Sequence, residues 1–163
     1  MREKLSTATA AAWVVVLAAV LCATVGKAHI DGGPLWDAAV HARREVRLAP
    51  LLEFRELSTV WYGPWVNLLG NIALFYPVGF LAYRRPLTTG FLLSLAIETT
   101  QFATYSGYSD IDDLIFNTLG AGLGGWAANR VGDRARTIVL ALLVVGCAAI
   151  VGIFAALAVW QRL

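Results

Sequence analysis

Long apolar stretches with almost no charge constrain this chain more than any other feature of its sequence. Five of them are present, at residues 5–26, 64–83, 86–105, 110–129 and 137–161. Each supplies roughly the 20 residues that are needed to cross a hydrocarbon core of about 30 Å. We therefore predict an all-α fold, a polytopic membrane helical bundle of about five transmembrane helices. The fourth stretch is the weakest, because its uncharged part is short.

The composition supports one membrane domain over the whole chain, residues 1–163. Hydrophobic residues make up 58% of the 163 residues and charged residues 15%, which is more apolar and less charged than a typical soluble domain. The formal net charge of +2 gives no support to nucleic-acid binding. Cys22 and Cys147 lie within apolar stretches, where buried free thiols are expected rather than a disulfide or a metal site.

Basic residues in the short connections determine the predicted orientation. If the five stretches span the membrane in alternation, three basic clusters fall on one side. These are Arg2 with Lys4, Arg84 with Arg85, and Arg130 with Arg134 and Arg136. Because basic residues favour the cytoplasmic side, we predict a cytoplasmic N-terminus and a C-terminus on the outside.

The loop at residues 27–60 then lies outside the cytoplasm. From Trp36 to Trp61 it mixes charged and apolar residues at helical spacing, interrupted by Pro50. Two interpretations stay open, a helix lying on the outer membrane surface or a solvated loop packed on the helix ends. The stretch at 5–26 is either a cleaved signal peptide or a retained helix. Its 22 residues favour the retained helix, because signal-peptide apolar cores are shorter.

Polar side chains form a stripe on each of three predicted helices. Residues three, four or seven positions apart share one face of an α-helix. The stripes consist of Asn67 and Asn71, of Ser94, Glu98 and Gln101, and of Asp110, Asp113 and Asn117. At 1.5 Å per residue, Asn71, Glu98 and Asn117 all lie roughly 10 to 12 Å below the outer membrane edge. We therefore predict that these residues form a binding cleft in the outer half of the bilayer.

The carboxyl groups of this cleft are candidates for chemistry. A charge at this depth costs roughly 2.5 to 3.5 kcal/mol, so function explains Glu98 and Asp113 better than helix packing does. They are the candidate catalytic residues. With Asp110 they form a set of oxygen ligands of the kind that suits Mg²⁺ or Ca²⁺, although no metal is assigned. Asn67 and Gln101 fit hydrogen bonding between helices equally well.

Neighbouring residues receive no role in the cleft. Gly120 and Gly124, four positions apart, permit two helices to approach closely. Asp112 is expected to point into solvent. His29 and His41 are loop residues without a pattern of partners.

Three segments resemble the VanZ-like family of bacterial membrane proteins. They read NLLGNIALFYPVGFLAYRR from Asn67, SLAIETTQ from Ser94 and DIDDLIFNTLGAGLG from Asp110. The family pattern combines Phe-x-Pro-x-Gly, Ser-x-x-x-Glu-x-x-Gln and Asp-x-x-Asp-x-x-x-Asn in this order. The resemblance covers about residues 67–125. It carries over the polar positions Asn71, Glu98, Gln101, Asp110, Asp113 and Asn117.

The resemblance implies an integral protein of the bacterial cytoplasmic membrane. The founding member of the family is associated with low-level resistance to the glycopeptide teicoplanin. Family members often carry an arginine three residues before the first aspartate, where this chain has Gly107. If that arginine pairs with the acidic residues, its role is either missing here or supplied by Arg43, Arg44 or Arg47 of the outer loop.

The first functional hypothesis is a protein that acts at the outer face of the cytoplasmic membrane and lowers glycopeptide susceptibility. Its partners, besides the lipid bilayer, are a lipid-linked envelope component or the glycopeptide itself. One alternative is a membrane-embedded enzyme in which Glu98 and Asp113 act as acid and base. The others are an ion- or proton-coupled transporter and a structural partner of another membrane protein.

Overall fold

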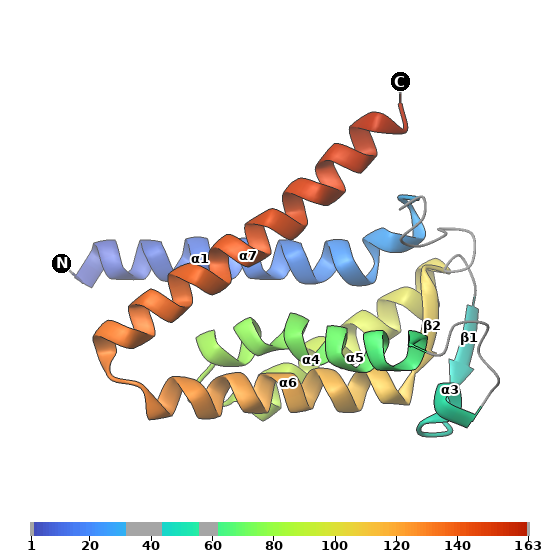
Figure 1. Ribbon diagram of the computed structural model, residues 1–163, viewed down its shortest axis with the longest axis horizontal. Coiled ribbons are helices and arrows are strands. Elements are labelled where there is room, and N and C mark those ends of the chain that lie inside the picture. The colour runs from blue at the N-terminus through green and yellow to red at the C-terminus, as the bar shows by residue number, and fades with distance from the viewer. Residues whose placement is uncertain (1, 32–43, 56–61, 163) are drawn as a thin grey trace.

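The computed structural model describes residues 2–31, 44–55 and 62–162, and most of these are helical (Figure 1). The long helices are α1 (Arg2–Thr24), α4 (Gly63–Leu81), α5 (Pro86–Thr104), α6 (Ile111–Arg130) and α7 (Asp133–Trp160). The shorter elements are the 3-10 helix η1 (Gly26–Ala28), the helix α3 (Leu52–Arg55) and the strands β1 (Arg44–Arg47) and β2 (Gly107–Asp110). The predicted helical fold class is confirmed, with one pair of short strands added to it.

Among the residues that the structure describes, three segments are long and apolar enough to cross a membrane. They are Thr7–Ala28, Gly63–Leu81 and Asp133–Trp160. α5 and α6 have 19 and 20 residues and pack against α4, but their polar residues lower their hydropathy. These three helices identify the protein as a membrane protein. The count of five spans and the orientation of the termini remain predictions.

Local sequence explains where the helices begin. Pro64 and Pro86 stand in the first turns of α4 and α5, where the missing N–H of proline costs no helical hydrogen bond. Asp110 caps α6, because its side chain accepts a hydrogen bond from a backbone amide of the first turn. α7 begins at Asp133 rather than at residue 137. The helix includes Asp133, Arg134 and Arg136, which the predicted span leaves out because they are charged.

The core lies where α1, α4, α5 and α7 meet. α1, α4, α5 and α6 run side by side, and α7 crosses them obliquely (Figure 1). Val16 and Val20 of α1 pack with Phe75 and Val78 of α4, and Cys147 of α7 joins the same cluster. Both cysteines are free, as the sequence predicts, with Cys147 buried and Cys22 half-buried.

Glycines allow α4 and α6 to pack with their backbones in contact. A Cβ atom at Gly124 would overlap the carbonyl oxygen of Tyr76, and one at Gly120 would overlap that of Ile72. The predicted role of the two glycines in close helix approach is therefore confirmed. Because the helix axes are so close, short polar side chains on α4 and α6 reach each other.

β1 and β2 pair in parallel and lie at one end of the bundle (Figure 1). The register places Arg44 opposite Gly107 and Arg47 opposite Asp110. A helix through this part of the outer loop is one interpretation of the sequence, and it is wrong over β1. Pairing with a strand far along the chain supplies hydrogen bonds that a helix would otherwise make. After Pro50 a short helix does form, α3 at Leu52–Arg55. The rest of that interpretation falls on residues 36–43 and 56–61, outside the described residues.

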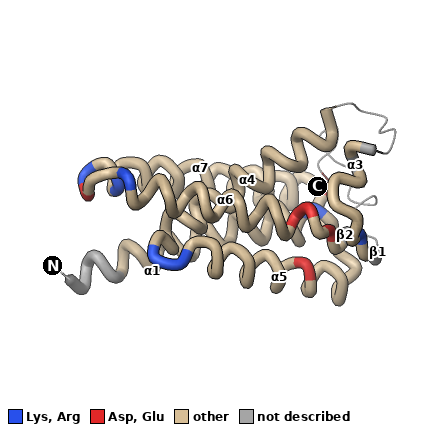
Figure 2. The backbone as a smooth tube through the Cα atoms, turned by 90° about the horizontal axis from the view of Figure 1, so that it is seen from below, with Lys and Arg blue, Asp and Glu red and all other residues tan. Residues whose placement is uncertain are grey.

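Charged residues gather at the two ends of the bundle (Figure 2). Arg84 and Arg85 lie between α4 and α5, and Arg130, Arg134 and Arg136 lie where α6 gives way to α7. The acidic residues of α5 and of the start of α6 lie at the opposite end, beside β1 and β2. We call the first the basic end and the second the acidic end, although Lys and Arg residues lie at the second as well.

Candidate functional site

Two amides of α4 hold the carboxylate of Asp113 on α6. Asn67 Nδ2 donates a hydrogen bond to Asp113 Oδ1 over 3.3 Å, and Asn71 Nδ2 donates to the same oxygen. Asn71 Nδ2 also donates to Asn67 Oδ1 at 3.4 Å. The close packing of the two helices brings the second and third turns of α4 against the first turn of α6. The polar stripes of the second and fourth predicted spans therefore meet.

Glu98 of α5 lies beside the start of α6. Only 8% of the residue is exposed, and its Oε2 accepts a hydrogen bond of 3.0 Å from the backbone N–H of Asp110. Ser109 Oγ donates to the backbone carbonyl of Glu98 at 2.8 Å. β2 is thereby attached to α5, and the carboxyl groups of Glu98, Asp110 and Asp113 come close enough to repel one another.

Ser94, Gln101 and Asn117 complete the buried cluster. Asn117 Nδ2 donates to Ser94 Oγ at 2.9 Å, and Gln101 Nε2 donates to the carbonyl of Thr24 at 3.5 Å. Within the described part of the chain, Asn117 Oδ1 and Gln101 Oε1 are buried without a hydrogen-bond partner. A buried acceptor left unpaired costs about 1–3 kcal/mol, so both oxygens favour a donor from a bound molecule.

Asp112 contradicts its prediction. The residue is 5% exposed, and its two carboxylate oxygens accept hydrogen bonds from the backbone N–H of Leu51 at 3.0 and 2.8 Å. The expectation that Asp112 points into solvent is therefore wrong. The outer loop folds back over the start of α6, and helical periodicity does not reveal such a long-range contact.

Asp110 lies in β2, ahead of the first residue of α6, and is also buried. Burial raises the pKa of its carboxyl group to about 6. The charges of Asp113 and Asp112 contribute to this rise of the pKa, whereas the hydrogen bond from the Asp112 amide and the charge of Arg47 oppose it.

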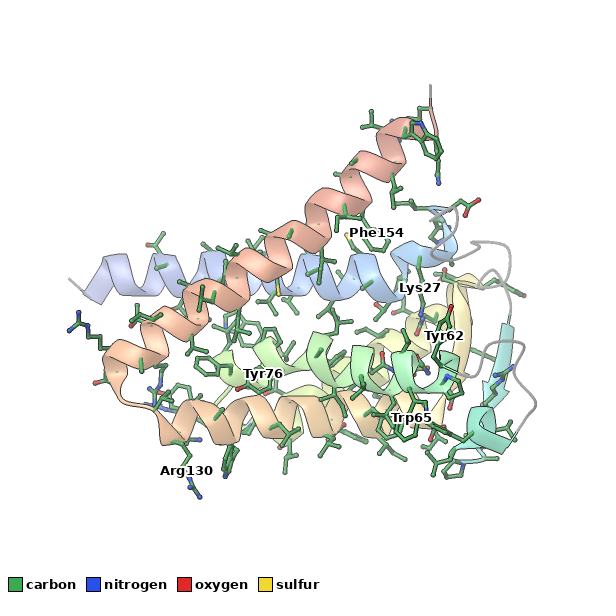
Figure 3. The ribbon with its side chains drawn as sticks, viewed as in Figure 1. Lys27, Tyr62, Trp65, Tyr76, Arg130 and Phe154 are labelled. Atoms are coloured by element: carbon green, nitrogen blue, oxygen red, sulfur yellow. The ribbon has the colours of Figure 1, made fainter. Side chains whose placement is uncertain are left out.

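Lys27 is a neighbour of the cluster that sequence reasoning missed. It lies in η1, beyond the end of α1, and its side chain extends toward the first turns of α4 (Figure 3). Its ammonium is close enough to attract the carboxylate of Glu98. His29, also given no role, lies with Nε2 at 3.0 Å from Ser106 Oγ. The sequence marks Lys27 as the end of an apolar stretch, but only the packing of α1 shows what it faces.

The carboxyl groups of the cluster are not arranged as a metal site. Among the described residues, no group of three or more His, Cys, Asp or Glu side chains is placed to hold a metal ion. Glu98 Oε2, Asp110 Oδ1 and Asp113 Oδ1 each accept a hydrogen bond from the protein instead. The Mg²⁺ or Ca²⁺ set considered from the sequence therefore gains no support from the geometry.

A sequence model of the VanZ/LLP1 family matches residues 13–132. The chain belongs to the VanZ/LLP1 family. No curated protein and no solved structure matches the chain. The family match is longer than the motifs at about 67–125, because it takes in most of α1 and the outer loop as well as α4, α5 and α6. It therefore contains the whole polar cluster of this VanZ/LLP1 protein, and the resemblance drawn from the motifs is confirmed.

Gly107 is the position where this VanZ/LLP1 chain departs from the expected arginine. Its φ is +152°, and a Cβ atom there would stand 2.9 Å from Gln101 Nε2. A side chain at this position is therefore strained and crowded. The local backbone fits the glycine and not the arginine that the family pattern leads us to expect.

The outer loop brings arginines to the same place. β1 sets Arg44 opposite Gly107 and Arg47 opposite Asp110, and the charge of Arg47 acts on the Asp110 carboxyl group. Of the arginines considered as replacements for the family arginine, Arg47 therefore does lie beside the acidic residues. Arg43, another, lies outside the described residues.

Proposed function

We propose that this VanZ/LLP1 protein acts at the outer face of the bacterial cytoplasmic membrane and lowers susceptibility to glycopeptides such as teicoplanin. It does so by binding a lipid-linked envelope component or the glycopeptide itself. The binding residues are those of the polar cluster. They are Asn67, Asn71, Ser94, Glu98, Gln101, Asp110, Asp113 and Asn117.

The outer-face assignment is supported by the charge distribution along the bundle. The arginines of the two tight connections lie at the end opposite the acidic residues (Figure 2). Because basic connections favour the cytoplasm, the polar cluster then belongs to the outer side, where glycopeptides act. This orientation requires α5 and α6 to span the membrane together with the three more apolar helices.

The convergence of three helices on one buried polar cluster carries the proposal. Amides alone suffice to join membrane helices, and buried carboxyl groups without a function are disfavoured because each is costly to desolvate. Here Glu98 and Asp113 come from different helices, lie close to each other and adjoin two unpaired carbonyl oxygens. Such a group of donors and acceptors is suited to a polar head group or a glycan.

The test is teicoplanin and vancomycin susceptibility of a sensitive bacterium that expresses the wild type, Glu98→Gln or Asp113→Asn at equal membrane levels. We expect the wild type to protect and both variants to lose most of that protection. Asp133→Asn is the matched control, because Asp133 is a fully exposed carboxylate at the basic end. Equal protection by all four proteins would show that the carboxyl groups of the cluster are dispensable. A wild type without protection would remove the glycopeptide assignment.

An enzyme acting on a lipid-linked substrate is the second candidate, favoured by the proximity of Glu98 and Asp113. Two neighbouring carboxyl groups serve as an acid and base pair when one of them holds a proton. On this account the purified protein converts its substrate, whereas Glu98→Gln and Asp113→Asn bind it without turnover. Product formation by either variant at the wild-type rate argues against catalysis by that residue.

A further inference from the structure

A groove lies beside the polar cluster, between α4 and α7. Its volume is about 550 Å³, within the range of about 300–1,000 Å³ that is usual for ligand pockets. α4 contributes Leu74 and Pro77 to the lining, and α7 contributes Leu142, Leu143 and Ile150. Most of the lining is apolar, so the greater part of the groove suits a hydrocarbon chain.

The polar residues of the groove are Lys27, Asn67 and Asn71, and Lys27 is the only charged residue that lines it. Within residues 2–31, 44–55 and 62–162, Lys27 makes no salt bridge. Its ammonium therefore gives the groove a positive charge next to two amides. An anionic group is complementary to this arrangement.

Depth separates the polar part of the groove from the apolar part. The lining residues belong to the three segments that are long and apolar enough to cross a membrane. At 1.5 Å per residue, Asn67 lies about 6 Å along α4 from Gly63, whereas Pro77 lies about 21 Å along it. The groove thus runs from the level of lipid head groups into the hydrocarbon core.

We propose that this groove binds a membrane lipid with a phosphate head group. The phosphate lies at Lys27 beside the amides of Asn67 and Asn71, and one hydrocarbon chain lies between α4 and α7. Asp113 does not line the groove, whereas the two asparagines that donate to it do. The inference rests on the proposed function in one respect. It names a lipid phosphate as the class of molecule that the neighbouring polar cluster would bind.

Two glycines leave the space in which the chain would lie. Gly70 of α4 and Gly146 of α7 both line the groove, and a Cβ atom at either meets nothing within 4 Å. A side chain at either position therefore starts in open space on the groove wall, and leucine there takes up part of the groove. Gly152, also on α7 with open space at its Cβ, does not line the groove and supplies a matched control.

The experiment measures binding of palmitoyl lysophosphatidic acid, of monopalmitoylglycerol and of inorganic phosphate to the purified full-length protein in detergent. We expect lysophosphatidic acid to bind most tightly. Lys27→Met should weaken its binding by about tenfold or more, as for the loss of one charge-assisted hydrogen bond, and leave monopalmitoylglycerol binding unchanged. Arg134→Met, at an exposed arginine of the basic end, should change neither.

Filling the groove gives an independent result. Gly146→Leu should weaken the binding of both lipids, and Gly152→Leu should weaken the binding of neither. Thermal unfolding checks that each variant is folded. If Gly146→Leu does not fold, Gly70→Leu tests the same space from α4. Equal binding of the two lipids by the wild type overturns the inference, and so does an unchanged affinity in Lys27→Met or in the groove-filling variant.

The two proposals fail separately. Binding is measured on purified protein, so intact lipid binding without glycopeptide protection counts against the proposed function alone. Intact protection without lipid binding counts against this inference alone.

Discussion

Asp112 and Asp113 are adjacent in the chain but are held by different parts of the protein. Asp113 accepts hydrogen bonds from the side-chain amides of Asn67 and Asn71, and Asp112 accepts from the backbone of Leu51. Neighbouring positions on a helix point about 100° apart, so one carboxylate faces the bundle and the other faces the outer loop. The first belongs to the cluster, and the second fixes the loop that covers it.

We expect the loss of the Asp112 carboxylate to loosen the outer loop. Asp112→Ala leaves the Leu51 N–H without its acceptor and removes a negative charge from the first turn of α6, at a cost of about 1–2 kcal/mol. Hydrogen exchange of residues 44–55 measures the effect. Asp112→Asn retains one acceptor oxygen and should exchange more slowly than the alanine variant. Equal rates of hydrogen exchange at residues 44–55 in the wild type and in Asp112→Ala would show that the contact does not hold the loop.

Asp110 makes the stability of the protein depend on pH. Its pKa is about 6 in the folded protein and near 3.9 in an unfolded chain, so between these values the folded state binds more protons. Stability should therefore fall as pH rises through this window. A tenfold change in proton affinity corresponds to about 1.4 kcal/mol, so the two pKa values set an upper limit of about 3 kcal/mol. Because solvent screens a carboxyl group near the surface, Asp110→Asn should remove less than this, on the order of 1 kcal/mol of the dependence.

Thermal unfolding in detergent between pH 4 and 7 measures this difference. Asparagine keeps an oxygen that can accept from the Asp112 amide, so the cap of α6 is retained in the variant. Glu98, Asp112, Asp113 and Arg47 face Asp110 and are present in both proteins, so only the difference between the two profiles reports on Asp110. Parallel profiles would contradict the prediction.

At the scale of the elements, the pair α4 and α6 positions the cluster. The glycines of α6 bring its backbone against the carbonyl groups of α4, and the amide-to-carboxylate contacts depend on that short separation. α7 is different, since it crosses the bundle obliquely (Figure 1) and leaves a groove against α4. Tight packing thus forms the polar cluster, and loose packing forms the apolar groove.

Gly124→Ala and Gly152→Ala should change stability in opposite directions. The new methyl group at Gly124 meets the carbonyl of Tyr76, and such overpacking costs about 1–3 kcal/mol. At Gly152 nothing lies within 4 Å, so alanine gains up to about 1 kcal/mol from its higher helix propensity. Thermal unfolding of the two variants in the same detergent measures both effects. A Gly124→Ala variant as stable as Gly152→Ala contradicts the close packing of α4 and α6.

At the scale of the whole molecule, the two ends differ in charge and in structure. The basic end consists of two tight connections, whereas the acidic end carries β1, β2 and α3 (Figures 1 and 2). The end of α7 also reaches the acidic end, where Gln161 Nε2 donates to the carbonyl of Asp31 at 2.6 Å. The C-terminus of α7 and the loop after α1 therefore lie on the same side.

Reporter fusions test the orientation of the molecule. We expect alkaline phosphatase to be active when it is fused after Leu163 and inactive when it is fused after Arg84. A fluorescent protein that folds only in the cytoplasm should give the reverse pattern. Phosphatase activity at both positions, or at neither, contradicts the predicted odd number of spans (three) between Arg84 and the C-terminus.

The sequence by itself determined the helical class, the approximate helix positions and the polar stripes. Apolar runs and the periodicity of a helix are local properties, and a single chain displays them directly. The motifs at about 67–125 likewise indicated the family that the match over residues 13–132 shows.

The tertiary structure alone decided which groups meet. The pairing of β1 with β2, the burial of Asp112 under Leu51 and the position of Lys27 beside Glu98 all join residues far apart in the chain. Such contacts depend on how helices pack and where a loop returns, and no local pattern records them. The groove between α4 and α7 is of the same kind, because its shape depends on the angle at which two helices cross.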